Sequence, residues 1–213
     1  MIAIHTTKKL YAKLPTVASM KQCEIEESEA NTLDSADPAS RLGNDNPLSG
    51  WHANLLILQR RNCILLVHDA TRFPLFIKGL VKADFAHFDR LFADALMNTL
   101  LKLDASETQL DTAAALLAPC RFDSNCNRSV QGTMNRMAGD LEHMLWIEEA
   151  RLEDICSYAT GAWLADRPCT VKGQKDWIRP DRAMLALLNR VANAVPAKQN
   201  VVQLADYLSS RDG

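Results

Sequence analysis

The sequence predicts an α+β fold in which a small, mostly antiparallel sheet is packed by several amphipathic helices. Strand-like runs joined by short links gather before residue 80, and apolar residues at helical spacings of three and four dominate after it. Hydrophobic residues make up 47% of the chain and charged residues 23%, which is near the average for a globular protein with a buried core. Together, these observations lead to that fold class.

The strands are expected in the first third of the chain. Residues 2–6 alternate and include β-branched side chains, which predicts a first strand. Runs at 51–59, 63–68 and 73–77 are joined by short links, so we expect an antiparallel meander. Within the last of them, Pro74 favours an edge position or a bulge because proline cannot donate a ladder hydrogen bond.

The helices follow. Asp84 is expected to cap a helix whose apolar stripe runs from Phe85 to Leu103. The clearest helical pattern begins at Ser129 and is expected to continue, or to bend into a further helix, as far as Leu164. The remaining elements expected are helices at 107–117, from Pro180 and at 201–208, and a strand at 120–124.

We expect residues 1–148 to form the main α+β domain and residues 149–213 a helical C-terminal extension packed on it. Residues 19–48 differ from the rest of the main domain. Between positions 22 and 46, seven acidic residues face one basic residue, a local charge of -6. Such a segment buries too little apolar surface to offset its ordering entropy, so we interpret it as a flexible surface loop. Because the whole chain carries -2, the other residues carry about +4.

Composition also bears on the expected partners and cellular compartment of the protein. A net charge of -2 and a pI near 6.2 disfavour a chain that coats nucleic acid or an anionic membrane. No run approaches the ~18 apolar residues of a membrane span, and the N-terminus lacks the pattern of a secretory signal. The six cysteines are scattered without a C-x-x-C pair, as in a reduced compartment. We therefore expect a cytoplasmic protein with no metal site, no cofactor and no membrane contact.

Common catalytic signatures are absent from the sequence. It contains no glycine-rich phosphate loop, no H-E-x-x-H, no G-x-S-x-G and no paired-cysteine zinc motif. This absence lowers the weight of the common enzyme classes without eliminating catalysis.

The first polar cluster covers residues 68–72 at a predicted turn between strands. A histidine beside a carboxylate can act as an oriented base, and a nearby arginine can hold an anion. This makes His68 a candidate catalytic residue and Thr71 and Arg72 candidate ligand-binding residues. The alternative is an ordinary turn, since aspartate and threonine are turn formers themselves.

The second cluster covers residues 125–135. Asn127 or Ser129 would cap the helix and leave free backbone N–H groups at its positive end, where Arg128 adds a guanidinium. Gly132 in a helix suggests that a ligand or another backbone approaches closely. With Asn135, these residues are candidates for binding a phosphate or carboxylate. The alternative is a capped helix packed tightly on the sheet, with Arg128 in a structural ion pair.

Several motifs together resemble a bacterial family of domains of unknown function. They are the opening stretch 2–10 and the segments at 50–56, 60–71, 79–84 and 127–135, in this order. The resemblance covers roughly residues 1–145, and only the stretch from Pro180 to Leu188 and Pro168 match loosely beyond them. It implies one compact α/β unit from a bacterium or a mobile element, and it supplies no activity, cofactor or catalytic residue.

Three functions follow as hypotheses. The favoured one is a non-catalytic binding or regulatory protein of bacterial or mobile-element origin, with a protein partner and an anion-binding patch at a helix N-terminus. The first alternative is an enzyme acting on a phosphate-containing substrate such as a nucleotide or RNA, with His68 as base and Arg72 and Arg128 as anion clamps; it requires the two clusters to meet in space. The second is a nucleic-acid-binding protein that uses the mildly basic body.

Overall fold

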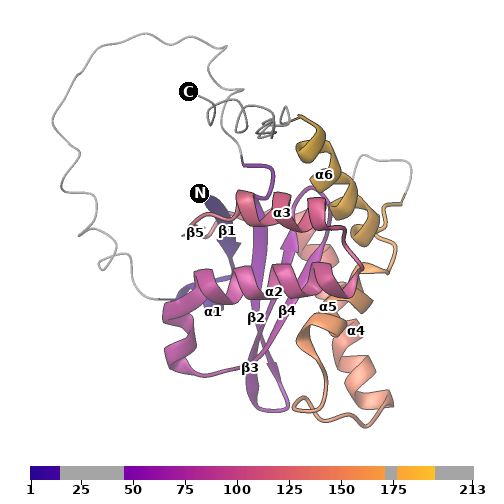
Figure 1. Ribbon diagram of the computed structural model, residues 1–213. Coiled ribbons are helices and arrows are strands. Elements are labelled where there is room, and N and C mark those ends of the chain that lie inside the picture. The colour runs from indigo at the N-terminus through magenta and orange to yellow at the C-terminus, as the bar shows by residue number, and fades with distance from the viewer. Residues whose placement is uncertain (15–45, 171–176, 195–213) are drawn as a thin grey trace, which may run out of the picture.

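The computed structural model describes residues 1–14, 46–170 and 177–194 (Figure 1). Most of the acidic segment at 19–48 and the helix expected at 201–208 lie outside these residues. The expected α+β class is confirmed, because helices pack against a single sheet that is mostly antiparallel.

The sheet has five strands in the spatial order β4-β3-β2-β1-β5. Their bounds are Ile2–Thr6 for β1, Trp51–Leu58 for β2, Arg61–His68 for β3, Pro74–Leu80 for β4 and Cys120–Asp123 for β5. The antiparallel meander of β2, β3 and β4 is confirmed, and Pro74 begins an edge strand as expected. In addition, β1 lies parallel to both β2 and β5.

Local sequence explains the meander. Only Gln59 and Arg60 separate β2 from β3, and their φ angles of 45° and 67° are typical of the turn that matches strand twist in a hairpin. The stretch from Cys63 to His68 is buried throughout, because helices cover both faces of β3.

Most helices lie where the periodicity predicts them. Their bounds are Lys8–Tyr11 for α1, Phe88–Lys102 for α2, Glu107–Leu116 for α3, Arg128–Ile147 for α4, Ser157–Ala165 for α5 and Pro180–Ala194 for α6. Two details differ from expectation. Asp84 lies in a preceding 3-10 helix, Lys82–His87, where its carboxylate accepts from the Val81 N–H at 2.7 Å, so it does not cap α2. Of the two alternatives for the helix from 129, continuation is wrong, because the helix ends at Ile147 and α5 is a separate element.

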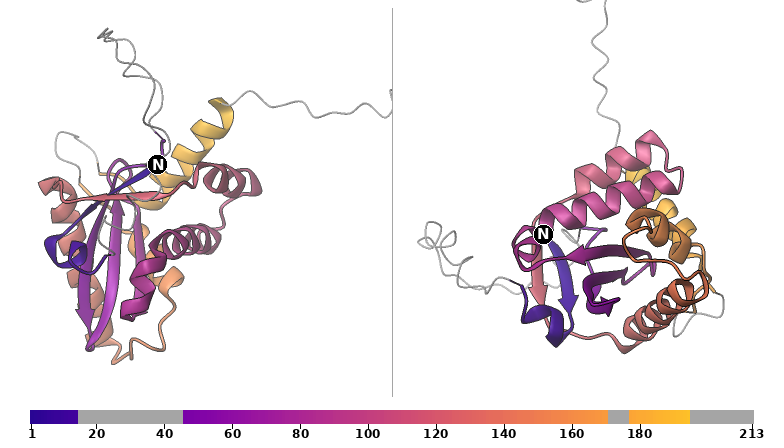
Figure 2. Two further views of the ribbon diagram at one scale, coloured as in Figure 1. Left: turned by 90° about the vertical axis from the view of Figure 1, so that its left-hand side faces the viewer. Right: turned by 90° about the horizontal axis from the view of Figure 1, so that it is seen from below.

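The helices form two layers around the sheet (Figure 2). One face packs against α1, α2, α3 and α6, with Trp51 against Phe92 at its centre. The other face carries α4, whose Met134 and Met137 pack on Val67 and its neighbours. Helix α5 lies against β4 and α2, as the figures also show. There Gly161 permits close approach, because a Cβ at this position would lie 3.2 Å from Thr99.

Candidate functional site

A row of polar side chains crosses three strands on the α4 face of the sheet. The parallel registers place His5 of β1 beside His52 of β2 on one side and Asp123 of β5 on the other. Neighbouring strands in register point aligned side chains to the same face, and Val67, opposite His52, belongs to the core under α4. Helix α4 packs on β2 and β3, so His52 is buried, whereas the His5 side chain is 19% exposed.

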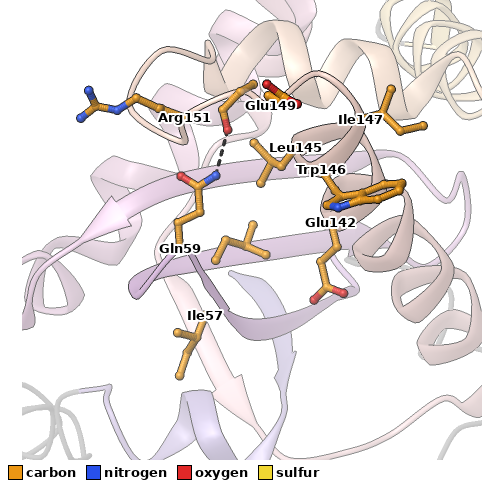
Figure 3. A pocket seen from close by; sticks show the side chains of 10 residues that line it. Ile57, Gln59, Glu142, Leu145, Trp146, Ile147, Glu149 and Arg151 are labelled. Carbon is orange, nitrogen blue, oxygen red and sulfur yellow. Dashed lines mark hydrogen bonds between the residues drawn. The ribbon is translucent and has the colours of Figure 1, made fainter.

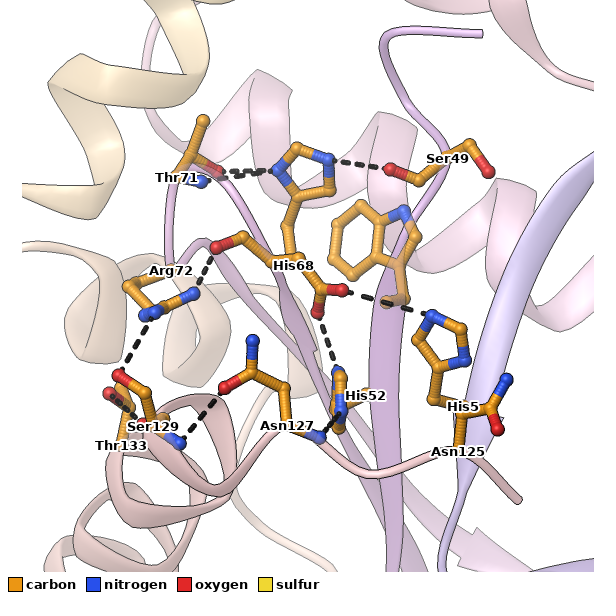
Figure 4. A network of polar contacts seen from close by, with 12 residues as sticks. His5, Ser49, His52, His68, Thr71, Arg72, Asn125, Asn127, Ser129 and Thr133 are labelled. Carbon is orange, nitrogen blue, oxygen red and sulfur yellow. Dashed lines mark hydrogen bonds and ion pairs between the residues drawn. The ribbon is translucent and has the colours of Figure 1, made fainter. Parts of the chain in front are cut away.

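Asp69, just after β3, links the two histidines (Figure 4). His52 Nδ1 donates to Asp69 Oδ1 at 2.6 Å, and His5 Nδ1 donates to Asp123 Oδ1 at 2.7 Å. The other oxygen of Asp69, Oδ2, lies 3.8 Å from His5 Nε2. We call Asp123, His5, Asp69 and His52 the histidine–aspartate chain.

The hydrogen bonds determine which ring nitrogen is free. A carboxylate only accepts, so Nδ1 carries the proton in both rings. His52 Nε2 accepts from the backbone N–H of Asn127 at 2.8 Å, so both of its nitrogens are engaged. His5 Nε2 has no hydrogen-bond partner among the residues that the structure describes. His5 is therefore the ring whose lone pair is available.

Asp123 is held as a carboxylate. Its burial alone would raise its pKa, but hydrogen bonds from His5 and from the backbone N–H of Asn125, the latter at 2.8 Å, outweigh burial. The pKa of Asp123 therefore lies below its ordinary value. The ionised form suits an acceptor that fixes the orientation of His5.

Asp69 is positioned by Gly50. The Asp69 N–H donates to the Gly50 carbonyl at 2.8 Å. Gly50 has a φ of +87°, and a Cβ there would lie 3.3 Å from Asp69 Oδ2. A glycine at position 50 thus permits both the left-handed backbone conformation and the close approach of the Asp69 carboxylate.

The amino end of α4 borders this chain. Asn127 caps the helix, its Oδ1 accepting from the Ser129 N–H at 3.0 Å. Arg72 joins the two predicted clusters, because its Nη2 donates to Ser129 Oγ at 3.3 Å and its Nη1 to the Asp69 carbonyl (Figure 4). The structure therefore brings Arg72 of the first cluster together with Asn127 and Ser129 of the second. Arg128 is exposed at the first position of α4.

Arg72 is a buried cation. It is 3% exposed, its Nε lacks a hydrogen-bond partner, and none of the carboxylates in the described part of the chain forms an ion pair with it. Burial lowers the pKa of Arg72, while the charge of Asp69 acts in the opposite direction; a guanidinium nevertheless stays protonated. A fixed positive charge thus lies beside the positive end of α4.

His68 and Thr71 occupy the other side of the same turn and are almost fully buried. His68 Nε2 donates to the Ser49 carbonyl at 3.2 Å, and Nδ1 accepts from Thr71 Oγ1 at 2.9 Å. The ring also contacts Trp51, with centroids 4.9 Å apart, and burial lowers the pKa of His68 to about 4. This geometry does not favour His68 as a base, because both nitrogens are engaged in a dry environment.

A family model described as a domain of unknown function, DUF6933, matches residues 3–183. The chain belongs to the DUF6933 family. The match extends beyond the roughly 145 residues of the expected resemblance, and it includes the whole histidine–aspartate chain and α4. Comparison of this DUF6933 chain with curated proteins and with solved structures finds no match.

The remaining predicted residues of the DUF6933 domain lie further along α4. Asn135 and Gly132 are exposed, and a Cβ built at Gly132 meets no described atom within 4 Å. The expected close approach of another backbone to Gly132 is therefore wrong for the described residues. Arg128 likewise forms no ion pair with them, so its binding role stays a prediction.

Three residues of this DUF6933 site were missed by sequence reasoning, namely His5, His52 and Asp123. His5 and His52 are polar residues inside mostly apolar strands, whereas Asp123 ends the short strand β5 and has no such signal. Their meeting depends on the parallel pairing of β1 with two strands that are distant in sequence.

A pocket at the opposite end of α4 is less suited to chemistry (Figure 3). It has a volume of about 1000 Å³, and Ile57, Trp146 and Glu142 contribute to its lining. Its charged side chains are exposed, and none of its lining residues belongs to a buried polar network. In the described part of the DUF6933 chain, no helix is long and apolar enough to cross a bilayer, and no cluster of three metal-ligating side chains occurs.

Proposed function

We propose that the protein binds a small phosphate-containing ligand at the amino end of α4. The observation that carries this proposal is the buried guanidinium of Arg72. It donates to Ser129 Oγ and lacks a paired carboxylate among the described residues. A buried charge is costly unless it is paired, so an anion adjacent to Arg72 would relieve this cost.

The end of α4 supplies the matching donors. The first backbone N–H groups of a helix have no partner inside it, and here Asn127 satisfies that of Ser129 while its own N–H binds His52. The N–H group of Arg128 is left for a ligand, and the exposed Arg128 side chain can reach the same ligand. The arrangement favours a phosphate group, which can accept several donors at once.

The two carboxylates nearby do not cancel this preference. Asp69 Oδ1 and Asp123 Oδ1 accept from the two histidine rings, whereas the one oxygen of Asp69 that accepts from Arg72 is its backbone carbonyl. The negative charges are thus engaged by His52 and His5, away from the donors at α4. A protein partner and a nucleic-acid ligand stay predictions without a specific contact to support them.

The test is a titration with inorganic phosphate followed on backbone amide resonances. We expect saturable shifts that are largest at Arg128, and weaker binding by about fivefold in Arg128→Gln, which corresponds to roughly 1 kcal/mol. Arg182→Gln, an exposed change on α6, is the matched control and should bind as the unchanged protein does. Shifts that do not saturate, or an equal loss in both variants, would contradict the proposed site.

A further inference from the structure

The pocket at the carboxyl end of α4 lies between that helix and the hairpin turn after β2. Glu142, Leu145 and Trp146 share one face of α4, because they are three and four residues apart. Leu58 and Gln59 line the pocket from the hairpin (Figure 3). Its volume of about 1000 Å³ reaches the upper limit of ordinary small-molecule sites, so the space suits the side chains of a protein segment.

Large apolar side chains are exposed around this pocket. Among the residues that the structure describes, Ile57, Trp146 and Ile147 are exposed, and all three line it. Single exposed apolar residues are common on a protein surface, whereas several gathered around one hollow mark a contact surface. A tryptophan is effective in such a contact, because its rigid ring buries a large area with little loss of conformational freedom. We therefore expect Trp146 to form the centre of the contact.

The charges that line the pocket and remain unpaired are negative. Arg151 donates to Glu153 at 2.7 Å, so its guanidinium is already engaged. Glu142 and Glu149 form no ion pair with any residue that the structure describes. The carboxyl end of a helix also carries partial negative charge, since its last carbonyl groups have no partner inside the helix. The pocket therefore attracts cationic groups.

Glu149 occupies a position that glycine usually holds. Helix α4 ends in a Schellman motif, in which the Ala150 N–H donates to the Leu145 carbonyl at 3.1 Å. The Glu149 N–H donates to the Trp146 carbonyl at 3.4 Å, and Glu149 has the left-handed φ of +48° that this motif requires. A glutamate is less stable than a glycine in this conformation. Strained residues cluster at functional sites, so a carboxylate here, in the lining of the pocket, indicates a role in recognition.

We propose that this pocket binds a basic amphipathic segment of a partner protein, which inserts an apolar side chain beside Trp146. Basic side chains of the segment pair with Glu142 and Glu149. The opposite charges select the partner, and burial of the Trp146 ring supplies most of the affinity. This inference goes beyond the phosphate site and does not depend on it, because the two surfaces lie at opposite ends of α4.

The experiment titrates the full chain with two synthetic helical peptides of equal length. One is built of leucine and lysine, and the other of leucine and glutamate. Isothermal titration calorimetry at low and high salt measures their affinities. We expect saturable binding of the lysine peptide that weakens as salt is raised, and no binding of the glutamate peptide.

A pair of tryptophan variants tests the apolar centre. Trp146→Ala should weaken binding of the lysine peptide at least about tenfold, because it removes the ring that the partner covers. Trp177→Ala is the matched control, since Trp177 is similarly exposed and does not line the pocket, and it should bind as the unchanged protein does. An equal loss of affinity in both variants would overturn the proposal.

A pair of glycine variants tests the carboxylate without loss of fold. Glu149→Gly should weaken binding about threefold and raise Tm by about 3 °C, because glycine fits the left-handed position. Asp104 has a φ of +54° in the same motif at the end of α2, although aspartate tolerates this region better than glutamate. Asp104→Gly should also raise Tm and leave binding unchanged. A stabilised Glu149→Gly that binds as tightly as the unchanged protein would contradict the role of Glu149.

The remaining outcomes concern other occupants of the pocket. Equal binding of the two peptides, or no saturable binding of the lysine peptide, would overturn the basic partner. Sedimentation velocity of the unchanged protein and of Trp146→Ala tests for a second copy of the chain. A dimer that Trp146→Ala dissociates would assign this surface to self-association and overturn the proposal, whereas a monomer in both cases supports it.

Discussion

His68 and His5 are polar residues on the two strands that flank β2, and the sheet places them on opposite faces. His68 lies on the α2 face against Trp51, is 1% exposed, and has a partner for each nitrogen. His5 lies on the α4 face, where the helix covers β2 and β3, and one of its nitrogens is free of described partners. Coverage by helices, more than residue type, separates a structural histidine from a candidate reactive one.

The largest expected effect is the difference in stability between alanine variants of His68 and His5. His68→Ala leaves a cavity and removes the partner of the Ser49 carbonyl, so we expect a loss of about 4 kcal/mol in the free energy of unfolding. His5→Ala removes one hydrogen bond at a partly exposed position and should cost about 1 kcal/mol. Urea denaturation of both variants measures the two losses, and equal values would break the comparison.

The pH dependence of stability should follow His68. Its pKa is about 4 in the folded protein and about 6.5 in the unfolded chain, so the unfolded chain takes up the proton first as pH falls. Stability is then complete above about pH 6.5 and declines by about 3 kcal/mol on acidification to about pH 4.

Urea denaturation across this range should show that His68→Gln lacks the His68 part of the decline. His87→Gln, an exposed change, should retain it. The same slope in both variants would show that other groups control acid stability.

The smallest expected change in the free energy of unfolding comes from the contact between Gly50 and Asp69. Gly50 and Gly79 both have positive φ, so alanine at either position should cost about 1 kcal/mol through backbone strain. Only at Gly50 does the new Cβ press on a neighbour, Asp69 Oδ2 at 3.3 Å, whereas at Gly79 it meets nothing within 4 Å. Gly50→Ala should therefore cost roughly 0.5 kcal/mol more than Gly79→Ala. Matching losses in thermal or urea denaturation would count against a role for this contact.

Sequence patterns predict the parts of the fold that depend on neighbours in the chain. The meander follows from short links between β2, β3 and β4, and the core stripe of α4 follows from its periodicity. The cap at Asn127 and the inclusion of Arg72 in the site were also predictable, because both rely on local motifs. The acidity of 19–48 likewise stands out locally, although the structure leaves most of that segment outside its description.

The histidine–aspartate chain could not be predicted in this way. It exists because β1 enters the sheet between β2 and β5, whose partner residues are 47 and 118 positions from His5. Parallel pairing leaves no turn signature in the sequence, and a one-residue shift of β1 would turn His5 to the opposite face. The choice of His68 over His5 had the same origin, because burial depends on which helix covers each face.

Helix α4 is attached at its amino end to β2, and the segment after its last turn is attached to the hairpin turn between β2 and β3. Its first turn is held through Asn127 and His52. Beyond its last turn, the Gln59 side chain donates to the Ala150 carbonyl at 2.8 Å (Figure 3), and it accepts from the Leu152 N–H at 2.8 Å. Between these points the helix packs continuously on the sheet. The helix is therefore held near both ends and supported along its length by the sheet. We therefore expect a displacement of the amino end of α4 to be felt at its other end, where Trp146, one of four tryptophans in the chain, is 76% exposed beside Gln59.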